Sequence, residues 1–290
     1  MMKTLLHLTE TPAPHWVGDG FPVRSLFSYD RLGRAASPFL LLDHAGPAHF
    51  DPAPQPRGVG EHPHRGFETV TIVFDGEVAH RDSTGEGGTI GPGDVQWMTA
   101  GDGILHEEFH SPAFTKRGGH LEMAQLWVNL PASAKRTPPG YQAITSERIP
   151  IVDLPDGAGR LRVIAGAYRD ATGPARTHTP MNVWDLRLAA GKRVVLPVAE
   201  GWSTLVPVLR GRVRIADSVE AGPSRVAVLA TTGSDVAVEA LEDSTLLLLS
   251  GQPIDEPLVG YGPFVMNSRE EIVQAIEDFN GGRFGRIAAP

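Results

Sequence analysis

Two histidines stand one residue apart, His62 and His64, in the charged run GEHPHRGFET at residues 60–69. If this run is extended, both rings face the same side, because side chains alternate along a strand. Two adjacent imidazoles repel each other when protonated and gain little packing when neutral. A shared metal ion would use both rings, so the pair predicts a metal site if the chain supplies further ligands.

A second pair with the same spacing lies in the run GILHEEFH at residues 103–110. His106 and Glu108 share one face of an extended strand, whereas Glu107 faces away. Two strands that each offer two ligands on one face can converge on one ion inside a barrel. Three neutral imidazoles and one carboxylate leave open positions in an octahedral shell, which suits Fe(II) best and also Mn, Ni, Cu or Co. Zinc prefers four ligands or fewer, so a zinc ion held by all four residues would have no coordination position left for a substrate.

The carboxylate ligand has a second candidate when only the residues are considered. Glu68 has the same strand parity as His62 and His64, so it competes with Glu108 for the same ion. Isolated histidines are predicted to be surface or satisfied core residues: His80, His110, His120 and His178. Large side chains near the motifs are predicted to belong to the core: Phe67, Trp97, Met98 and Trp127.

The elements that would position these residues are short strands separated by turns. Residues 67–74 are rich in β-branched and aromatic side chains, and further strands are predicted at 95–99, 104–110 and 122–130. Glycine-rich turns such as GEGG (85–88) and GPGD (91–94) separate them. Strands at this spacing are typical of an all-β sandwich or barrel.

The second half of the chain repeats the first. Residues 205–216 match 70–81 when Gly211 is aligned with Gly76, which indicates a duplicated β unit. Residues 233–240 similarly resemble residues 92–99. Residues 244–250 are expected to correspond to residues 104–110, but they contain no metal ligand. This alignment places Pro197 opposite His62, Ala199 opposite His64 and Ser203 opposite Glu68. The second unit is therefore predicted to keep the strands and to lack the polar set.

The domain boundary and the C-terminus have their own signals. Residues 131–159 contain five prolines and are interpreted as a linker with the start of a second domain, which gives domains of 1–135 and 136–290. Ser268 and Glu271 form a capping box. An amphipathic helix is predicted at 269–279, with its apolar face against a barrel. That face consists of Ile272, Ala275, Ile276 and Phe279.

Composition narrows the class of protein. The 290 residues carry a formal net charge of −8 and no basic run, which disfavours direct binding to nucleic acid or to anionic membranes. There is no cysteine, so nitrogen and oxygen atoms must hold any metal. No apolar stretch is long enough for a signal peptide or a membrane span. A cytoplasmic protein is therefore expected.

The segments HPHRGFET, PGDVQWMTAGDGILHEE, QLWVNLP and GPFVMN resemble the pirin family of the cupin superfamily, over about residues 20 to 280. The resemblance implies two cupin (double-stranded β-helix) barrels, with a metal only in the N-terminal one. It implies metal ligands at His62, His64, His106 and Glu108. Pirins use the glutamate of the second motif, so the resemblance favours Glu108 over Glu68.

Two classes of function follow from the resemblance. The first is a quercetin 2,3-dioxygenase, in which a flavonol and dioxygen meet at an iron site and Glu108 is both ligand and catalytic base. The second is a non-enzymatic iron-binding regulator that contacts a protein partner. Both use the same ligands, and in both cases a monomer is expected.

Overall fold

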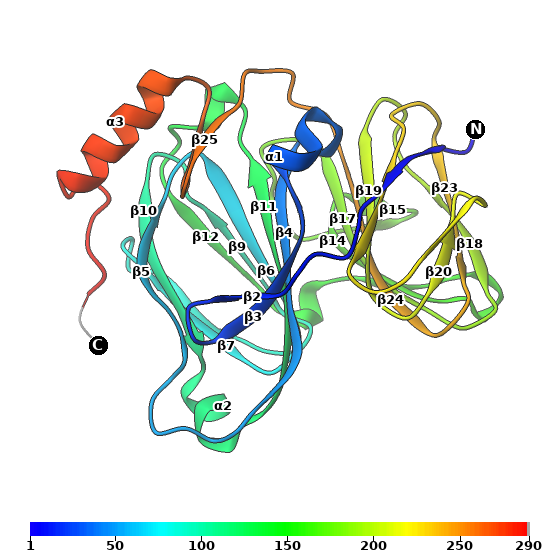
Figure 1. The fold of residues 1–290 in the computed structure, drawn as a ribbon, viewed down its shortest axis with the longest axis horizontal. Coiled ribbons are helices and arrows are strands. Elements are labelled where there is room, and N and C mark those ends of the chain that lie inside the picture. Colours follow the sequence, from blue (N-terminus) through cyan, green and yellow to red (C-terminus); the bar gives the residue numbers. More distant parts are fainter. Residues whose placement is uncertain (289–290) are drawn as a thin grey trace. The chain divides into compact units, whose positions relative to one another are not determined.

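The computed structural model describes residues 1–288, in which the chain forms two compact units (Figure 1). The N-terminal unit comprises Pro14–Arg24, Asp43–Ser146 and the segment that begins at Ile254. The C-terminal unit comprises Met1–Ala13, Ser25–Leu42 and Glu147–Pro253. These units differ from the predicted domains 1–135 and 136–290 at both chain ends, because each end of the chain joins the unit built mainly from the other half.

Two sheets build the N-terminal unit. The larger sheet has the strand order β12 (Gly140–Ile144), β9 (Val95–Thr99), β6 (Phe67–Asp75), β11 (Gly119–Asn129), β4 (Phe39–Phe50), β3 (Phe21–Ser28) and β2 (His15–Val17). The smaller sheet has the order β5 (Gly58–His64), β10 (Ile104–His110), β7 (Val78–Asp82) and β8 (Gly87–Ile90). The predicted strands at 67–74, 95–99, 104–110 and 122–130 are confirmed with small shifts of their ends. β-branched and aromatic residues between regularly spaced, glycine-rich turns carried that signal.

The C-terminal unit has the same arrangement of seven and four strands. Its larger sheet has the order β1 (Leu5–Leu8), β22 (Arg225–Leu229), β19 (Ser203–Arg210), β24 (Ser244–Gly251), β17 (Met181–Leu188), β14 (Gly159–Ala165) and β13 (Ile151–Asp153). Its smaller sheet has the order β18 (Arg193–Pro197), β23 (Asp235–Ala240), β20 (Val213–Ile215) and β21 (Val219–Ala221). The two strand orders correspond one to one, so the predicted duplication and the all-β cupin fold are confirmed.

Strand order corrects two details of the predicted alignment. Residues 233–240 contain β23, which has the place of β10 and not of β9, and 244–250 lie in β24, which has the place of β11. When the registers of β5 and β18 are superposed, the chain from β18 to Gly211 is also one residue longer than the chain from β5 to Gly76. As a result Leu196 and Val198, rather than Pro197 and Ala199, stand at the positions of His62 and His64.

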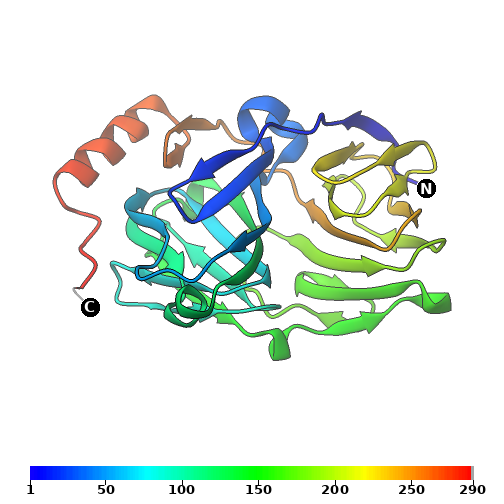
Figure 2. The same cartoon turned by 60° about the horizontal axis from the view of Figure 1, so that its bottom comes forward.

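The C-terminal helix α3 (Arg269–Asn280) is confirmed with its capping box, since Ser268 Oγ accepts from the Glu271 amide and the Glu271 carboxylate accepts from the Ser268 amide. Its buried Ile272 and Ala275 pack in a cluster with Leu105 of β10. Phe279 is 38% exposed, so that end of the predicted apolar face is only partly covered. In Figures 1 and 2 the red helix lies beside the strands of the N-terminal unit.

The remaining elements are short. Helical segments are α1 (Tyr29–Leu32), α2 (Pro112–Arg117), η1 (Gly33–Ala36), η2 (Ala132–Ala134), η3 (Ser146–Arg148) and η4 (Pro155–Gly157). Two small hairpins pair β15 (Ala167–Tyr168) with β16 (Ala171–Thr172) and β25 (Val259–Tyr261) with β26 (Phe264–Met266). Within residues 1–288, no helix has the length and apolar character needed to cross a bilayer.

Candidate metal centre

Three neighbouring strands of the smaller N-terminal sheet present their polar residues to the inside of that unit. His62 of β5 stands directly opposite His106 of β10 in the antiparallel register. The register then shifts by one residue, so that Glu108 stands opposite Val59. Such a bulge re-aims side chains without ending the strand pair. The two i, i+2 pairs of the sequence therefore lie side by side on one face.

The turn after His64 is built for close approach. Gly66 has a φ of +85°, and a Cβ at this position would lie 2.0 Å from the carbonyl oxygen of Val265. Only glycine accepts both the conformation and the contact. The buried Lys135 donates from Nζ to the carbonyl oxygens of Gly66 and Val265, at 2.8 Å each, which holds this turn beside His64.

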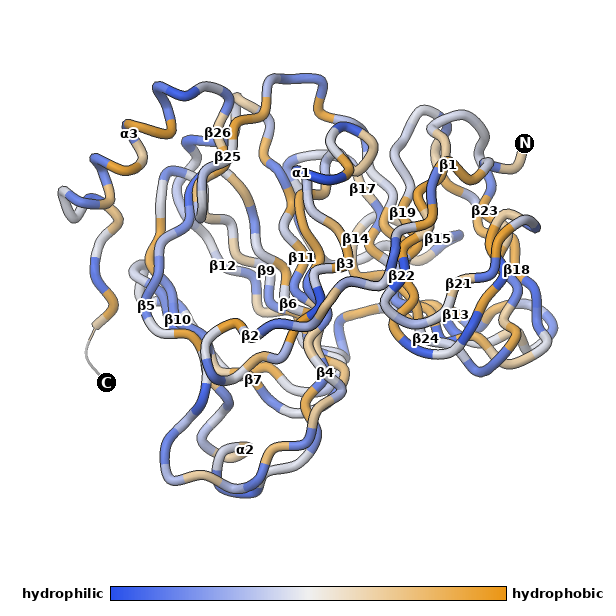
Figure 3. Tube along the Cα trace, viewed as in Figure 1, coloured by the Kyte–Doolittle hydropathy of each residue, from blue (hydrophilic) through white to orange (hydrophobic). Residues whose placement is uncertain are grey.

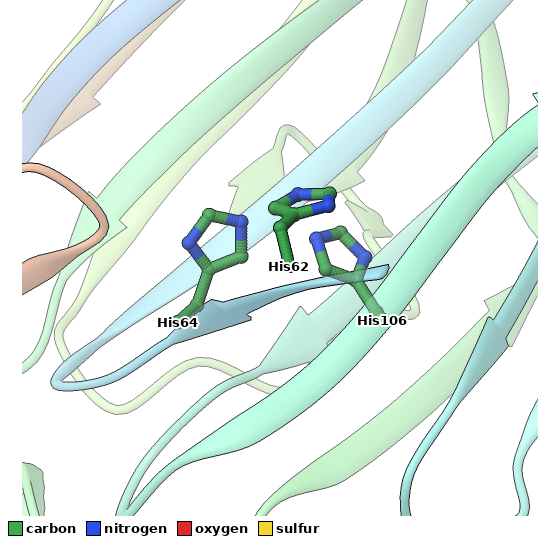
Figure 4. Close-up of side chains that lie close together, drawn as sticks. All are labelled: His62, His64 and His106. Atoms are coloured by element: carbon green, nitrogen blue, oxygen red, sulfur yellow. The ribbon is translucent and has the colours of Figure 1, made fainter. Parts of the chain in front are cut away.

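Three imidazole rings converge at this face, as Figure 4 shows for His62, His64 and His106. The ring centres of His106 lie 4.2 Å from those of His62 and 4.8 Å from those of His64. One ring nitrogen from each of the three residues lies within 4.8 Å of the others. His62 Nδ1 donates a hydrogen bond to the Gly60 carbonyl oxygen at 2.8 Å, so the lone pair of this ring lies on Nε2, where it can bind a metal ion.

The protonation of these rings suits metal binding. Burial lowers the pKa of His64 well below its ordinary value of 6.5, and the charge of His62 lowers it further. Burial, with the charges of His64, His62 and His80, does the same to the pKa of His106. Within the described residues, His106 Nε2 is buried without a hydrogen-bond partner, whereas the Pro263 backbone interacts with His64. Neutral imidazoles whose nitrogens converge in a cluster fit a divalent transition metal.

Glu108 adds a carboxylate to the same surroundings. Its Oε1 accepts from Thr71 Oγ1 at 3.3 Å and its Oε2 accepts from Gln125 Nε2 at 2.9 Å. Glu108 and His62 line one cavity, and Glu108 also groups with His106 and His80 as atoms that could hold an ion. The structure therefore gathers the three predicted histidines in one group, and it places the Glu108 carboxylate beside His106 and in one cavity with His62.

Glu68 lies apart from this cluster. On β6 the side chain of Thr71 reaches Glu108, and alternation turns Glu68 to the opposite face of the same strand. There Glu68 accepts from Thr99 Oγ1 at 2.7 Å, and burial raises its pKa to about 7 although that hydrogen bond acts to lower it. The parity argument for Glu68 is wrong because His64 and Glu68 belong to different strands, separated by the turn at Gly66.

The cavity beside the cluster is small. Its volume is about 30 Å³, which is room for about one water molecule. Besides the polar groups, mainly apolar side chains close it: Val17, Phe21, Val23, Ala45, Val59 and Met123. A drug-sized ligand usually occupies a cavity of roughly 300–1,000 Å³. A bulky substrate would therefore have to displace some of these side chains.

His80 is a satisfied core histidine, as predicted, but it does not stand alone. It is buried on β7, 3.1 Å from Asp82 and 3.3 Å from His106. The run His80-Arg81-Asp82 has the same i, i+2 spacing as the two predicted pairs, and this signal could have found it. The remaining histidines agree with their prediction, because His110 is a buried residue bonded to the Gly20 carbonyl and His120 and His178 are exposed.

Known proteins resemble this chain over its full length. A Pseudomonas aeruginosa protein provisionally named quercetin 2,3-dioxygenase is 60% identical to this chain, and the match covers 98% of this chain and 99% of that protein. A pirin-like protein of Caulobacter vibrioides is 42% identical, and the match covers 85% of this chain and 87% of that protein. A crystal structure titled quercetin 2,3-dioxygenase, from Acinetobacter baumannii, is 56% identical with a TM-score of 0.97, covering 99% of this chain and 100% of that one.

Family profiles agree with these relatives. The Pirin profile matches residues 20–128, and the Pirin C-terminal cupin domain profile matches residues 183–285. The prediction that the chain is an oxidoreductase agrees with the names that several relatives carry. From the profiles, the relatives and the shared fold together, this chain belongs to the pirin family.

Proposed function

We propose that the N-terminal unit binds one divalent transition metal ion through His62, His64, His106 and Glu108. The observation that carries the proposal is the convergence of one ring nitrogen from each of His62, His64 and His106 within 4.8 Å of one another. Among these rings, His106 Nε2 is buried without a partner within the described residues, and such an atom is costly unless a ligand satisfies it. Glu108 contributes the one negative charge of the set. It is held from two sides by Thr71 and Gln125, so its carboxylate is already positioned.

Fe(II) is the proposed ion, with Mn, Ni, Cu and Co as alternatives. Imidazole and carboxylate ligands discriminate weakly among these metals, so geometry and supply decide. Four protein ligands in an octahedral shell leave two positions open. These two open positions distinguish the proposed site from a structural zinc site, in which protein ligands fill every coordination position.

The proposed reaction is the opening of a flavonol such as quercetin by dioxygen. The bound ion would supply Lewis-acid and dioxygen chemistry. Glu108 would accept the proton of the flavonol hydroxyl at a carboxylate oxygen, with Gln125 Nε2 fixing the direction of that oxygen. The apolar residues around the cavity would exclude water from the reacting ring. The names of the relatives at 60% and 56% identity support this substrate class.

A non-enzymatic role is the second candidate, and the size of the cavity favours it. About 30 Å³ admits no flavonol unless lining side chains such as Phe21 or Met123 move. A metal-dependent regulator that contacts a protein partner needs no such opening. The two candidates therefore differ in whether a flavonol reaches the cluster.

Oxygen consumption by anaerobically iron-loaded protein, measured with a panel of flavonols, tests the proposal. We expect one dioxygen to be consumed per quercetin lost, and we expect His106→Ala to abolish both changes. A flavone without the 3-hydroxyl group serves as the matched substrate control, since it lacks the hydroxyl whose proton Glu108 would accept. Full iron occupancy with no oxygen uptake on any flavonol would exclude the dioxygenase and leave the regulatory candidate.

A further inference from the structure

A third polar pair, His80 and Asp82, lies on β7 beside the proposed ligands. His80 Nδ1 is 3.3 Å from His106 Nδ1, and His80 Nε2 is 3.1 Å from Asp82 Oδ2. Both side chains are almost fully buried, at 1% and 2% exposure. The ring of Tyr141 stacks on His80 with an interplanar angle of 13°. An unbroken chain of contacts therefore runs from Asp82 through His80 to His106.

The other oxygen of Asp82 is fully engaged. Asp82 Oδ1 accepts from the amide and the hydroxyl of Thr84, at 2.8 and 2.6 Å, and from the amide of Glu86 at 3.3 Å. These three donors fix the carboxylate, so that Oδ2 faces His80. A carboxylate oxygen can only accept, and the proton between Asp82 and His80 must therefore sit on His80 Nε2.

The surroundings of His106 decide the proton of the next contact. His106 Nε2 has no acceptor within the described residues, so the ring proton of His106 belongs on Nδ1. His106 Nδ1 then donates to the lone pair of His80 Nδ1, which agrees with the single proton of His80 on Nε2. His106 Nε2 is left with its lone pair, and it is the buried nitrogen that lacks a partner within the described residues.

We propose that Asp82 and His80 are positioning residues, which fix the tautomer of His106 so that its Nε2 lone pair faces the metal. Metal-bound histidines commonly donate their second nitrogen to an outer partner that sets their orientation and basicity. Here that partner is a second histidine, which is set in turn by a carboxylate. The inference rests on the proposed metal site and is independent of the dioxygenase reaction.

The first experiment uses the metal-free protein and needs no substitution. Long-range ¹H–¹⁵N correlation of protein labelled with ¹⁵N-histidine reports which ring nitrogen carries the proton. We expect opposite tautomers, with the proton on Nε2 in His80 and on Nδ1 in His106. A proton on Nε2 of His106 would overturn the proposal.

Titration of the same sample with Zn²⁺ as a diamagnetic probe follows. We expect the nitrogen signals of His62, His64 and His106 to shift as those of ligands do, and those of His80 to keep the Nε2-protonated pattern. If His80 shifts as a ligand, it binds the ion directly, as its grouping with His106 and Glu108 would permit. That result would also overturn the positioning role.

The substitution Asp82→Asn tests the direction of the relay. The three donors from Thr84 and Glu86 require an oxygen at Oδ1, so the new amide nitrogen must face His80. That amide donates, and His80 Nε2 must then accept. His80 Nδ1 becomes the donor to His106 Nδ1, and the proton of His106 moves to Nε2, where it blocks the metal.

We expect Asp82→Asn to reverse both tautomers and to weaken Zn²⁺ binding by about 10- to 100-fold in competition with a chromophoric chelator. Asp94→Asn is the matched control, because Asp94 also accepts from backbone amides, of Gly91 and Ser146, but contacts no histidine. Unchanged tautomers with wild-type Zn²⁺ affinity in Asp82→Asn would contradict the proposal. Oxygen uptake plays no part in these measurements, so a failed dioxygenase assay would leave them intact.

Discussion

The two units share one strand order and have opposite interiors. The inner face of β5, β10 and β7 carries imidazoles and carboxylates, whereas the corresponding face of β18, β23 and β20 is aliphatic. The registers place five residues of the C-terminal unit at the positions of His62, His64, His80, His106 and Glu108, in that order: Leu196, Val198, Ile215, Val236 and Val238. All five belong to the main hydrophobic cluster of that unit. In Figure 3 the strands of this unit carry many residues in the orange of hydrophobic side chains.

The difference shows that the cupin framework needs no polar centre in order to fold. Burying five polar side chains costs free energy unless each finds a partner, and the aliphatic unit avoids that cost. The register shift between β5 and β10 is absent between β18 and β23. Both departures lie on the strands that carry the proposed ligands, so we attribute them to function rather than to stability.

The largest expected effect comes from giving the N-terminal unit one residue of its counterpart. His106→Val installs the residue that the C-terminal unit has at this position, so the fold should persist while the metal is lost. Elemental analysis after iron loading should give one metal per wild-type chain and less than a tenth of that in the variant. His120→Val, on an exposed histidine, is the control and should keep the metal.

The reverse exchange should damage stability instead. Val238→Glu places a carboxylate in the aliphatic cluster without the hydroxyl and amide donors that Glu108 has. We expect the free energy of unfolding to fall by about 3–5 kcal/mol, as for an uncompensated buried charge. Denaturant titration measures it, with Val195→Glu on the exposed face of β18 as the control. Equal stability of the two variants would mean that the C-terminal interior tolerates charge.

Glu68 should make the stability of the N-terminal unit depend on pH, and the substitution Glu68→Gln should remove this dependence. Its pKa is raised from 4.5 to about 7, so the folded state holds a proton that the unfolded state has released between these values. Stability from this group is complete below pH 4.5, falls by about 3 kcal/mol as the pH rises to 7, and is constant above. Unfolding titrations at several pH values should show a flatter profile for Glu68→Gln than for the wild type. The exposed Glu147→Gln should follow the wild-type profile.

The smallest effect separates the two glutamates as ligands. Glu108→Gln keeps an oxygen atom near the cluster but removes the negative charge. We expect metal affinity to fall by about 10- to 100-fold, because the three histidine ligands stay in place. Glu68→Gln should change it less than about twofold, since Glu68 faces the other side of β6. Chelator competition measures both. The opposite ranking would show that the carboxylate is wrongly assigned.

The sequence was informative where the chemistry is local. Strand ends, the capping box of α3 and the i, i+2 pairs all depend on neighbouring residues, and they were predicted closely. Which carboxylate faces the histidines was not decided by parity, because the turn at Gly66 reorients the chain between His64 and Glu68. The contact between His80 and His106 was missed because it depends on the pairing of β7 with β10, which strand patterns alone do not specify.

The sequence also did not indicate which unit the C-terminal helix packs against. Nothing in the helix pattern of residues 269–279 says which sheet the helix covers. The structure pairs it with Leu105, directly before His106, and ties Asp278 to Arg65, directly after His64, with 2.6 Å between Oδ2 and Nη1.

That arrangement has a consequence for the order of events during synthesis. The metal-site strands are complete once residue 146 has been made, but the segment that packs behind His64 and Leu105 begins only at Ile254. At roughly 5–20 residues per second, a ribosome needs about 5 to 20 seconds to cover that interval. During that time the ligand strands exist without this segment packed against them, so a nascent chain offers a metal ion a more open route to the site than the finished protein does.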